Sequence, residues 1–255
     1  MKTAKNIEIV KGRSFIMTFD YHTHTTFSHG KGSIEDNVKV AVEKGLEGLA
    51  ISDHGPGHLF YGIKKEAVPE MRREIERLKP LYPQLNIYLS VEANIIDSDN
   101  YLDVKNKEIK DYDFVHAGYH YGVKKGRCIC NWLYGKEVFP GKERKKALEK
   151  FNTEITVGAI YENHIKILTH PGDKGPFNMD ELAKACAERG TLMEISTHHR
   201  NLTVEEIKVC SKYDVKFVVS SDAHVPHKVG TFAGGVQRAI DAGLDLGRIV
   251  NIKEI

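Results

Sequence analysis

Seven short runs of β-branched or apolar residues in this chain end in a histidine, a carboxylate or both. Imidazole nitrogens and carboxylate oxygens are common ligands of divalent transition metals, and a hydrolytic single-metal site needs about three such ligands plus a water. The chain offers a larger set, which predicts two or three ions with a carboxylate bridging one pair. The candidate metal ligands are His22, His24, His29, His54, Glu92, His120, His170, Asp222 and His224.

The spacing of these residues favours one shared site. His22 and His24 stand two residues apart at the end of a predicted strand, so their side chains point to the same side of it. Asp222 and His224 repeat that spacing after the last predicted strand. A single buried histidine is more often a core residue than a ligand. Here that alternative would have to hold for the whole set, residue after residue.

Further polar residues lie close to the candidate ligands. Asp20 and Asp53 lie one or two residues from a candidate histidine. Metal-bound imidazoles usually donate their second N–H to a carboxylate or carbonyl, so we expect both aspartates to accept from ligand histidines. A carboxylate that caps a turn is the alternative. The candidates for substrate contact at the same strand ends are His58, His198, His199 and Arg200.

The elements that must position these residues are strands alternating with helices. Such alternation predicts parallel strands with right-handed crossovers, whose carboxyl ends meet on one face. Seven units predict an α/β barrel that is incomplete or distorted relative to the eight-stranded form, with the site at the C-terminal ends of the strands. The predicted strands are Ile16–His22, Gly48–Ser52, Ile87–Glu92, Phe114–His120, Ile165–Thr169, Leu192–Ser196 and Lys216–Ser221.

Helix signals stand between these strands. Ser33 can cap a first helix, and Pro69 suits the first turn of a second. Asn178 or Asp180 begins another, and Thr203-Val-Glu-Glu206 is a capping box. The longest irregular stretch, residues 121–141, is either a lid over the strand ends or a solvated loop. Within it, Cys128 and Cys130 would share one face of an extended segment, but no second pair stands at zinc spacing.

Composition excludes several classes of function. Lys and Arg total 37 against 35 Asp and Glu, so the net charge of +2 predicts neither nucleic-acid binding nor membrane attachment. No segment approaches the ~20 apolar residues of a membrane span, and the first ten residues lack an apolar secretion core. We therefore expect a cytoplasmic protein. Its length suits a single α/β barrel domain over residues 1–255.

These motifs resemble the PHP family, named for polymerase and histidinol phosphatase domains. The resemblance covers residues 19–251 and is greatest to the YcdX-like phosphatase branch. It implies a distorted seven-stranded barrel with three metal ions. It assigns His22, His24, Glu92 and Asp222 to one ion, Glu92, His120 and His170 to a second, and His29, His54 and His224 to a third. The motifs are His22-Thr-His24, Phe-Ser-His29-Gly, Ser-Asp53-His54-Gly-Pro, Val-Glu92-Ala-Asn, Ala-Gly-Tyr-His120, Thr-His170-Pro-Gly and Ser-Asp222-Ala-His224.

The ligand set and the resemblance together predict hydrolysis of small phosphomonoesters at a trinuclear centre. Two close ions would lower the pKa of a bridging water, so a hydroxide can attack phosphorus near neutral pH. Glu92 and Asp222 would hold the ions, and Arg200 would add a bidentate clamp on the phosphate unless it forms a surface ion pair. Zinc is the favoured metal, with iron and manganese as alternatives.

Two other functions fit parts of the sequence. Phosphodiester cleavage at nucleic-acid ends resembles the exonuclease role of PHP domains fused to polymerases, but the chain lacks a basic, aromatic-rich surface for a strand. A non-catalytic metal-binding regulatory module is the alternative from another class, and the complete ligand set argues against it. We expect a small phosphorylated substrate and neither a membrane nor a nucleic-acid partner.

Overall fold

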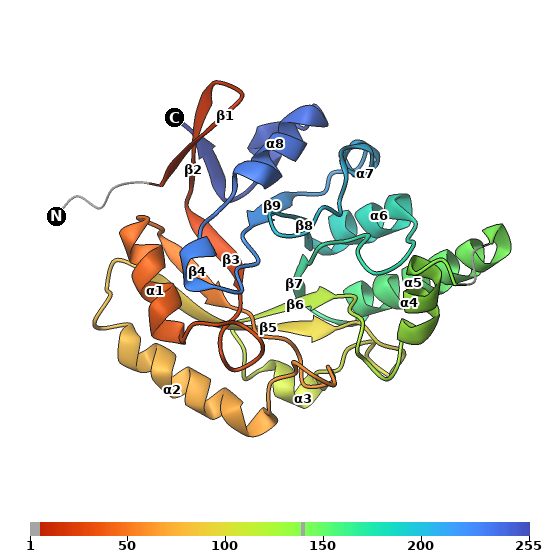
Figure 1. Ribbon diagram of the computed structural model, residues 1–255, viewed down its shortest axis with the longest axis horizontal. Coiled ribbons are helices and arrows are strands. Elements are labelled where there is room, and N and C mark those ends of the chain that lie inside the picture. Colours follow the sequence, from red (N-terminus) through yellow and green to blue (C-terminus); the bar gives the residue numbers. More distant parts are fainter. Residues whose placement is uncertain (1–5, 139–140) are drawn as a thin grey trace.

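A parallel sheet curved into a nearly closed barrel occupies the centre of the computed structural model, which describes residues 6–138 and 141–255 (Figure 1). The first and last strands of this sheet meet through a parallel bridge between Thr23 and Ala223. The predicted seven-stranded barrel is therefore confirmed. Its strands lie in chain order, each parallel to the next: β3 (Phe19–Thr23), β4 (Gly48–Ile51), β5 (Asn86–Asn94), β6 (Phe114–Gly118), β7 (Ile165–Leu168), β8 (Leu192–Ser196) and β9 (Phe217–Ser220).

The barrel strands are apolar because both of their faces are covered. Every residue of β4, β8 and β9 is buried, which explains why these runs do not alternate between apolar and polar residues. Glu194 in the middle of β8 differs from its apolar neighbours, because it is a fully buried carboxylate. A buried carboxylate needs partners to offset its lost hydration, and those partners lie in the site described below.

Helices connect the strands and cover the barrel (Figure 1). Ser33 and Thr203 both form the capping boxes that begin their helices, and the Asn178 side chain accepts from the N–H of Asp180. The helices are α1 (Ile34–Glu43), α2 (Val68–Leu78), α3 (Asn106–Ile109), α4 (Cys128–Gly135), α5 (Lys142–Glu162), α6 (Met179–Arg189), α7 (Val204–Cys210) and α8 (Ala233–Asp241), with short 3₁₀ turns η1 (Lys65–Ala67), η2 (Pro226–Lys228) and η3 (Leu246–Arg248).

A second, antiparallel sheet stands apart from the barrel. It consists of β1 (Ile7–Val10), β2 (Arg13–Met17) and β10 (Ile252–Glu254), so the C-terminal end of the chain lies beside β2 (Figure 1). The predicted strand Ile16–His22 is therefore two strands, because its first residues pair with β1 and β10. Just before β10, the buried side chain of Asn251 donates to Phe19 O at 2.7 Å and to Val219 O at 2.6 Å, which ties β3 to β9.

The stretch expected to be irregular, residues 121–141, contains a helix. Helix α4 occupies its middle, and residues 139 and 140 lie outside the described residues. Cys128 is buried and Cys130 is exposed, so the two thiols do not share a face. The expectation of an extended segment was wrong here, because neighbouring residues in a helix diverge by about 100°. In the described part of the chain, no helix has both the length and the apolar character needed to cross a membrane.

Candidate metal centre

The nine predicted ligands converge at the carboxyl ends of the barrel strands. His22 lies in β3 and Glu92 in β5, whereas the other ligands lie in the segments that directly follow their strands. His22 and His24 are buried beneath a pocket of about 220 Å³. The pocket itself is lined by the remaining seven, His29, His54, Glu92, His120, His170, Asp222 and His224.

Glu92 lies at the centre of this cluster, and its two oxygens face different histidines. Oε2 lies 3.0 Å from His54 Nδ1 and 3.3 Å from His22 Nε2. Oε1 lies 2.9 Å from His170 Nε2 and 3.2 Å from His120 Nε2. The carboxylate is fully buried. A carboxylate with a separate set of imidazoles at each oxygen is arranged to bridge two ions.

The remaining ligand atoms fall into compact groups. His22 Nε2 and His24 Nε2 are 3.0 Å apart, and Asp222 Oδ1 lies 3.2 Å from His24 Nε2. In each group, one ligand atom per residue lies within 4.8 Å of all the others, as atoms around one ion do. The groups are His22, His24 and Asp222; His24, His29, His54 and His224; His54, Glu92 and His120; and His170, His199 and Asp222.

Several buried donor and acceptor atoms in the cluster have no hydrogen-bond partner among the described residues. These include His120 Nε2, Glu92 Oε2 and Asp222 Oδ2. A buried polar atom without a partner costs free energy, so native structures rarely leave a whole group of them unsatisfied. Unsatisfied atoms that converge on a common point match the needs of divalent cations. The donor set, imidazole with carboxylate, suits zinc, iron or manganese.

Burial shifts the charge states of two candidate ligand histidines toward metal binding. It lowers the pKa of both His29 and His120 to about 3, against the opposing pull of Glu92. Those imidazoles are therefore neutral near pH 7, with lone pairs available to a metal. Burial raises the pKa of Glu92, but His22, His120 and His54 outweigh it and hold that pKa well below its usual value. Glu92 is thus an anion.

Glu194 supports the cluster from below, and the sequence analysis missed it. His22 Nδ1–H donates to Glu194 Oε1 at 2.8 Å, and the backbone N–H of His170 donates to Oε2 at 2.7 Å. The carboxylate thereby orients two candidate ligands at once, which fixes the ring of His22 with Nε2 toward the cluster. The available signal was a lone charged residue inside an otherwise apolar buried run.

Asp20 and Asp53 accept from backbone N–H groups and from hydroxyls rather than from the ligand rings. Asp53 accepts from the N–H and the hydroxyl of Thr25, at 2.8 and 2.6 Å, and from Ser28 Oγ at 2.5 Å. Asp20 accepts from Ser221 Oγ at 2.5 Å and from Gly230 N at 2.8 Å. Within the described residues, neither aspartate accepts from an imidazole N–H. They hold the segments that carry His29 and Asp222, so the expected contact to ligand rings was wrong.

The backbone around the ligands is tightly constrained. His170 has a φ of +29° and Asp222 a φ of +50°, a region that residues with a side chain rarely adopt and that costs about 1–3 kcal/mol. Gly118 allows its strand end to approach the centre. A Cβ there would lie 2.3 Å from Thr169 Oγ1 and 3.0 Å from Glu92 Oε1. These features indicate that the site is held in a specific geometry at some cost in stability.

The cation at the pocket is Lys174 rather than Arg200. Arg200 is exposed and is not among the lining residues, whereas Lys174 lines the pocket. Asp173 positions two neighbouring groups through Oδ2, with Lys174 Nζ at 2.6 Å and His199 Nδ1 at 3.1 Å. Burial lowers the pKa of His199, but Asp173 and Asp222 raise it to about 9 overall. In the metal-free protein His199 is therefore protonated at neutral pH.

The other residues expected to contact a substrate do reach the pocket. His58, His198 and His199 all line it. His199 also lies 3.2 Å from Asp222 Oδ2 through its Nε2, so it can serve as a further ligand. Tyr61, which the sequence analysis did not select, stacks on His29 with ring centroids 4.4 Å apart.

The chain is similar in sequence to a known family and to several named proteins. The family model "PHP domain" matches residues 20–198, more than half of the chain. A protein of Acetivibrio thermocellus named a probable phosphatase is 29% identical over 84% of this chain and 82% of its own length. Another probable phosphatase, from Caldanaerobacter subterraneus, is 28% identical over 95% of this chain and 90% of its own length.

A solved structure shares the fold. It is the histidinol phosphate phosphatase of Lactococcus lactis in complex with zinc, L-histidinol and phosphate. It superposes with a TM-score of 0.61 at 16% identity, covering 90% of this chain and 95% of the other.

Proposed function

Because this chain belongs to the PHP family, we propose that it is a metal-dependent phosphatase that hydrolyses small phosphomonoesters at a trinuclear centre. The related proteins named as probable phosphatases support this function. The Lactococcus lactis enzyme of the same fold, which binds zinc and phosphate, supports a divalent transition metal and a small phosphorylated substrate.

The arrangement around Glu92 carries the proposal. Its Oε2 side gathers His22, His24 and His54, and its Oε1 side gathers His120 and His170. We assign Glu92 as the bridge between two ions, with Asp222 as a further ligand beside His22 and His24. His29, His54 and His224 would hold the third ion. His54 lies within reach of two groups, so its ring can settle on either side.

Bound divalent ions would supply an activated water near neutral pH and would stabilise negative charge on the phosphate oxygens. The chain's own residues bind and orient the ester. Lys174 lines the pocket, so it would attract the phosphate dianion and contact its oxygens. His199 would do the same only if it does not bind an ion through Nε2. Asp173 keeps these two side chains in place through one of its oxygens, Oδ2. We therefore replace Arg200 by Lys174 as the proposed phosphate contact of the protein.

Elemental analysis and a phosphatase assay test this function together. Protein purified without added chelator should carry about two to three transition-metal ions per chain, because each ion takes about four ligands. It should hydrolyse para-nitrophenyl phosphate, lose this activity with a chelator, and regain it with zinc, manganese or iron. Saturation at one ion would exclude a trinuclear centre.

The substrate panel separates the alternatives. Absence of phosphatase activity in the fully metallated protein would overturn the proposed function and leave a non-catalytic metal-binding module. A large preference for a single-stranded oligonucleotide over every monoester would instead indicate an exonuclease.

A further inference from the structure

A large groove lies beside the metal pocket. It has a volume of about 950 Å³, against about 220 Å³ for the pocket itself. The groove is formed by the segments that follow β4, β5 and β6, so it opens on the same face of the barrel as the ligands. His58 lines both cavities, and its ring centroid lies 5.4 Å from that of His54. The groove therefore begins one imidazole away from a candidate ligand.

Four lysines line this groove, and only Lys105 is close enough to Glu108 to help lower the pKa of that carboxyl. Lys105, Lys107, Lys124 and Lys125 are all exposed, and none of them forms an ion pair with any residue that the structure describes. The acidic lining residues are Asp99 and the largely buried Asp103. Lysines from two separate segments around one hollow create a local positive potential, which concentrates anions.

Hydrogen bonds hold the floor and wall of the groove in place. Asp103 accepts from Gly57 N at 2.7 Å and from Asn94 N at 2.8 Å, so two backbone N–H groups hold its carboxylate. Leu59 N donates to Gly122 O at 2.8 Å, which joins the wall bearing His58 to the segment bearing Lys124. A preformed hollow of this kind lowers the entropic cost of binding a ligand.

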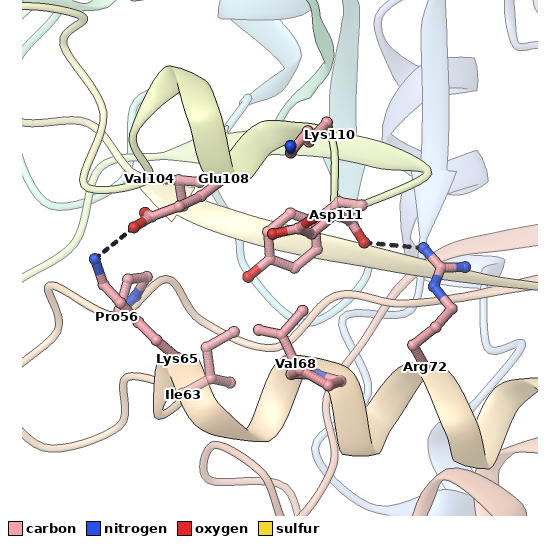
Figure 2. A pocket seen from close by; sticks show the side chains of 11 residues that line it. Pro56, Ile63, Lys65, Val68, Arg72, Val104, Glu108, Lys110 and Asp111 are labelled. Atoms are coloured by element: carbon pink, nitrogen blue, oxygen red, sulfur yellow. Dashed lines mark hydrogen bonds and ion pairs between the residues drawn. The ribbon is translucent and has the colours of Figure 1, made fainter.

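A neighbouring cavity provides a contrast. The cavity in Figure 2 has a volume of about 440 Å³ and shares Pro56 with the groove. Its cations are largely paired within the protein. Lys65 lies 2.8 Å from Glu108, and Arg72 donates to Asp111 O at 3.0 Å (Figure 2). Arg72 also lies 2.8 Å from Asp113. The lysine-lined groove has no comparable internal pairing, so its charge is available to a ligand.

We propose that the groove is a second anion subsite, and that the substrate is a small organic bisphosphate. One phosphate would be hydrolysed at the metal pocket while the other, on the leaving group, binds Lys124, Lys125, Lys105 or Lys107 past His58. The size of the groove suits a small molecule, since such sites typically span about 300–1,000 Å³. This inference rests on the proposed phosphatase function and specifies the class of substrate for the same site.

Matched substrate pairs test the proposal with fully metallated protein. Each pair shares one carbon skeleton, such as fructose 1,6-bisphosphate with fructose 6-phosphate, or adenosine 3′,5′-bisphosphate with adenosine 5′-monophosphate. For at least one pair, kcat/KM should be about tenfold or more higher for the bisphosphate, the scale of one charge-assisted contact. The double variant K124A/K125A should lose about 10–100-fold in kcat/KM on that bisphosphate and much less on para-nitrophenyl phosphate. The control K184A/K212A removes two exposed lysines from the far side of the barrel and should keep the preference.

The outcomes separate the two proposals. Hydrolysis of para-nitrophenyl phosphate with no preference for any bisphosphate would overturn the groove subsite and leave the phosphatase function standing. Equal losses in K124A/K125A on bisphosphates and on para-nitrophenyl phosphate would also overturn the subsite. A preference for a 5′-phosphorylated oligonucleotide over all bisphosphates would replace the small substrate with a nucleic acid. If no ester is hydrolysed, the phosphatase function fails. Calorimetric binding of the same bisphosphates to the wild type and to K124A/K125A then still decides the subsite.

Discussion

Replacing Glu194 by glutamine tests whether the candidate ligands are held in place by the barrel core. The change keeps the size of the side chain and removes its charge. Glu194 now accepts from His22 Nδ1–H at 2.8 Å and from the His170 N–H at 2.7 Å. A glutamine has one acceptor oxygen, so only one of these donors would keep its partner. The other would face the amide NH₂, which is itself a donor.

The magnitude follows from those two bonds. A hydrogen bond to a charged group contributes about 1.5–3 kcal/mol, so Glu194→Gln should lower the free energy of unfolding of the metal-free protein by about that amount. Carboxylates that orient metal-bound imidazoles contribute about 10–100-fold to metal affinity. We therefore expect metal affinity to fall by that factor, which corresponds to about 1.4–2.7 kcal/mol.

Competition with a chromophoric chelator measures the metal affinity, and chemical denaturation of the metal-free protein measures stability. Glu205→Gln is the matched control, because Glu205 is an exposed residue in the first turn of α7. That variant should behave as the wild type in both assays. If Glu194→Gln binds metal as tightly as the wild type and hydrolyses para-nitrophenyl phosphate at the same rate, Glu194 does not orient the ligands and the reasoning is refuted.

Five further substitutions test separate parts of the site and its surroundings. Glu92→Gln should lower turnover by about 10²–10³-fold with the circular dichroism spectrum retained, and near-normal turnover at full metal occupancy would contradict its bridging role. Gly118→Ala should cost about 1–3 kcal/mol of unfolding free energy by overpacking against Thr169 and the Glu92 carboxylate, so an unchanged denaturation midpoint would refute the close approach. Lys174→Gln should reduce kcat/KM about tenfold or more while Arg200→Gln stays close to wild type, and the opposite order would restore Arg200 as the phosphate contact. In the metal-free protein the pKa of His199 is raised from 6.5 to about 9. The wild type should therefore be more stable than a His199→Gln variant below about pH 6.5, and this difference in unfolding free energy should disappear as the pH passes about 9. An equal difference between the two proteins across that range would exclude the shift.

The barrel could be predicted from the sequence because its pattern is local. Each strand is a short apolar run, and a parallel α/β arrangement places all carboxyl ends on one face. His120 and His170, 50 positions apart in the chain, are thereby brought to the same carboxylate oxygen. The periodicity of the sequence is sufficient for this step, since no side-chain packing has to be known.

Other features depend on contacts that no local pattern encodes. The pairing of β2 with β10 joins residues at opposite ends of the sequence, so it was missed. Arg200 follows β8 in the sequence, as predicted. The chain turns at Leu202, which has a φ of +50°, and Arg200 is exposed. Lys174 lies four residues beyond His170 with a φ of +64°. Turns of this kind decide which cation reaches the pocket.

The link that Asn251 makes between β3 and β9 has a consequence for the order in which the barrel closes and a metal can bind. Asn251 lies 232 positions from Phe19, its partner across the seam of the barrel, and contacts between such distant residues form late because the intervening chain must first be ordered. His22 and His24 lie on one side of that seam and Asp222 on the other. An ion held by all three can be captured only after the seam has closed. Metal uptake would then follow the closure of the barrel, and the bound ion would stabilise the junction between its two ends.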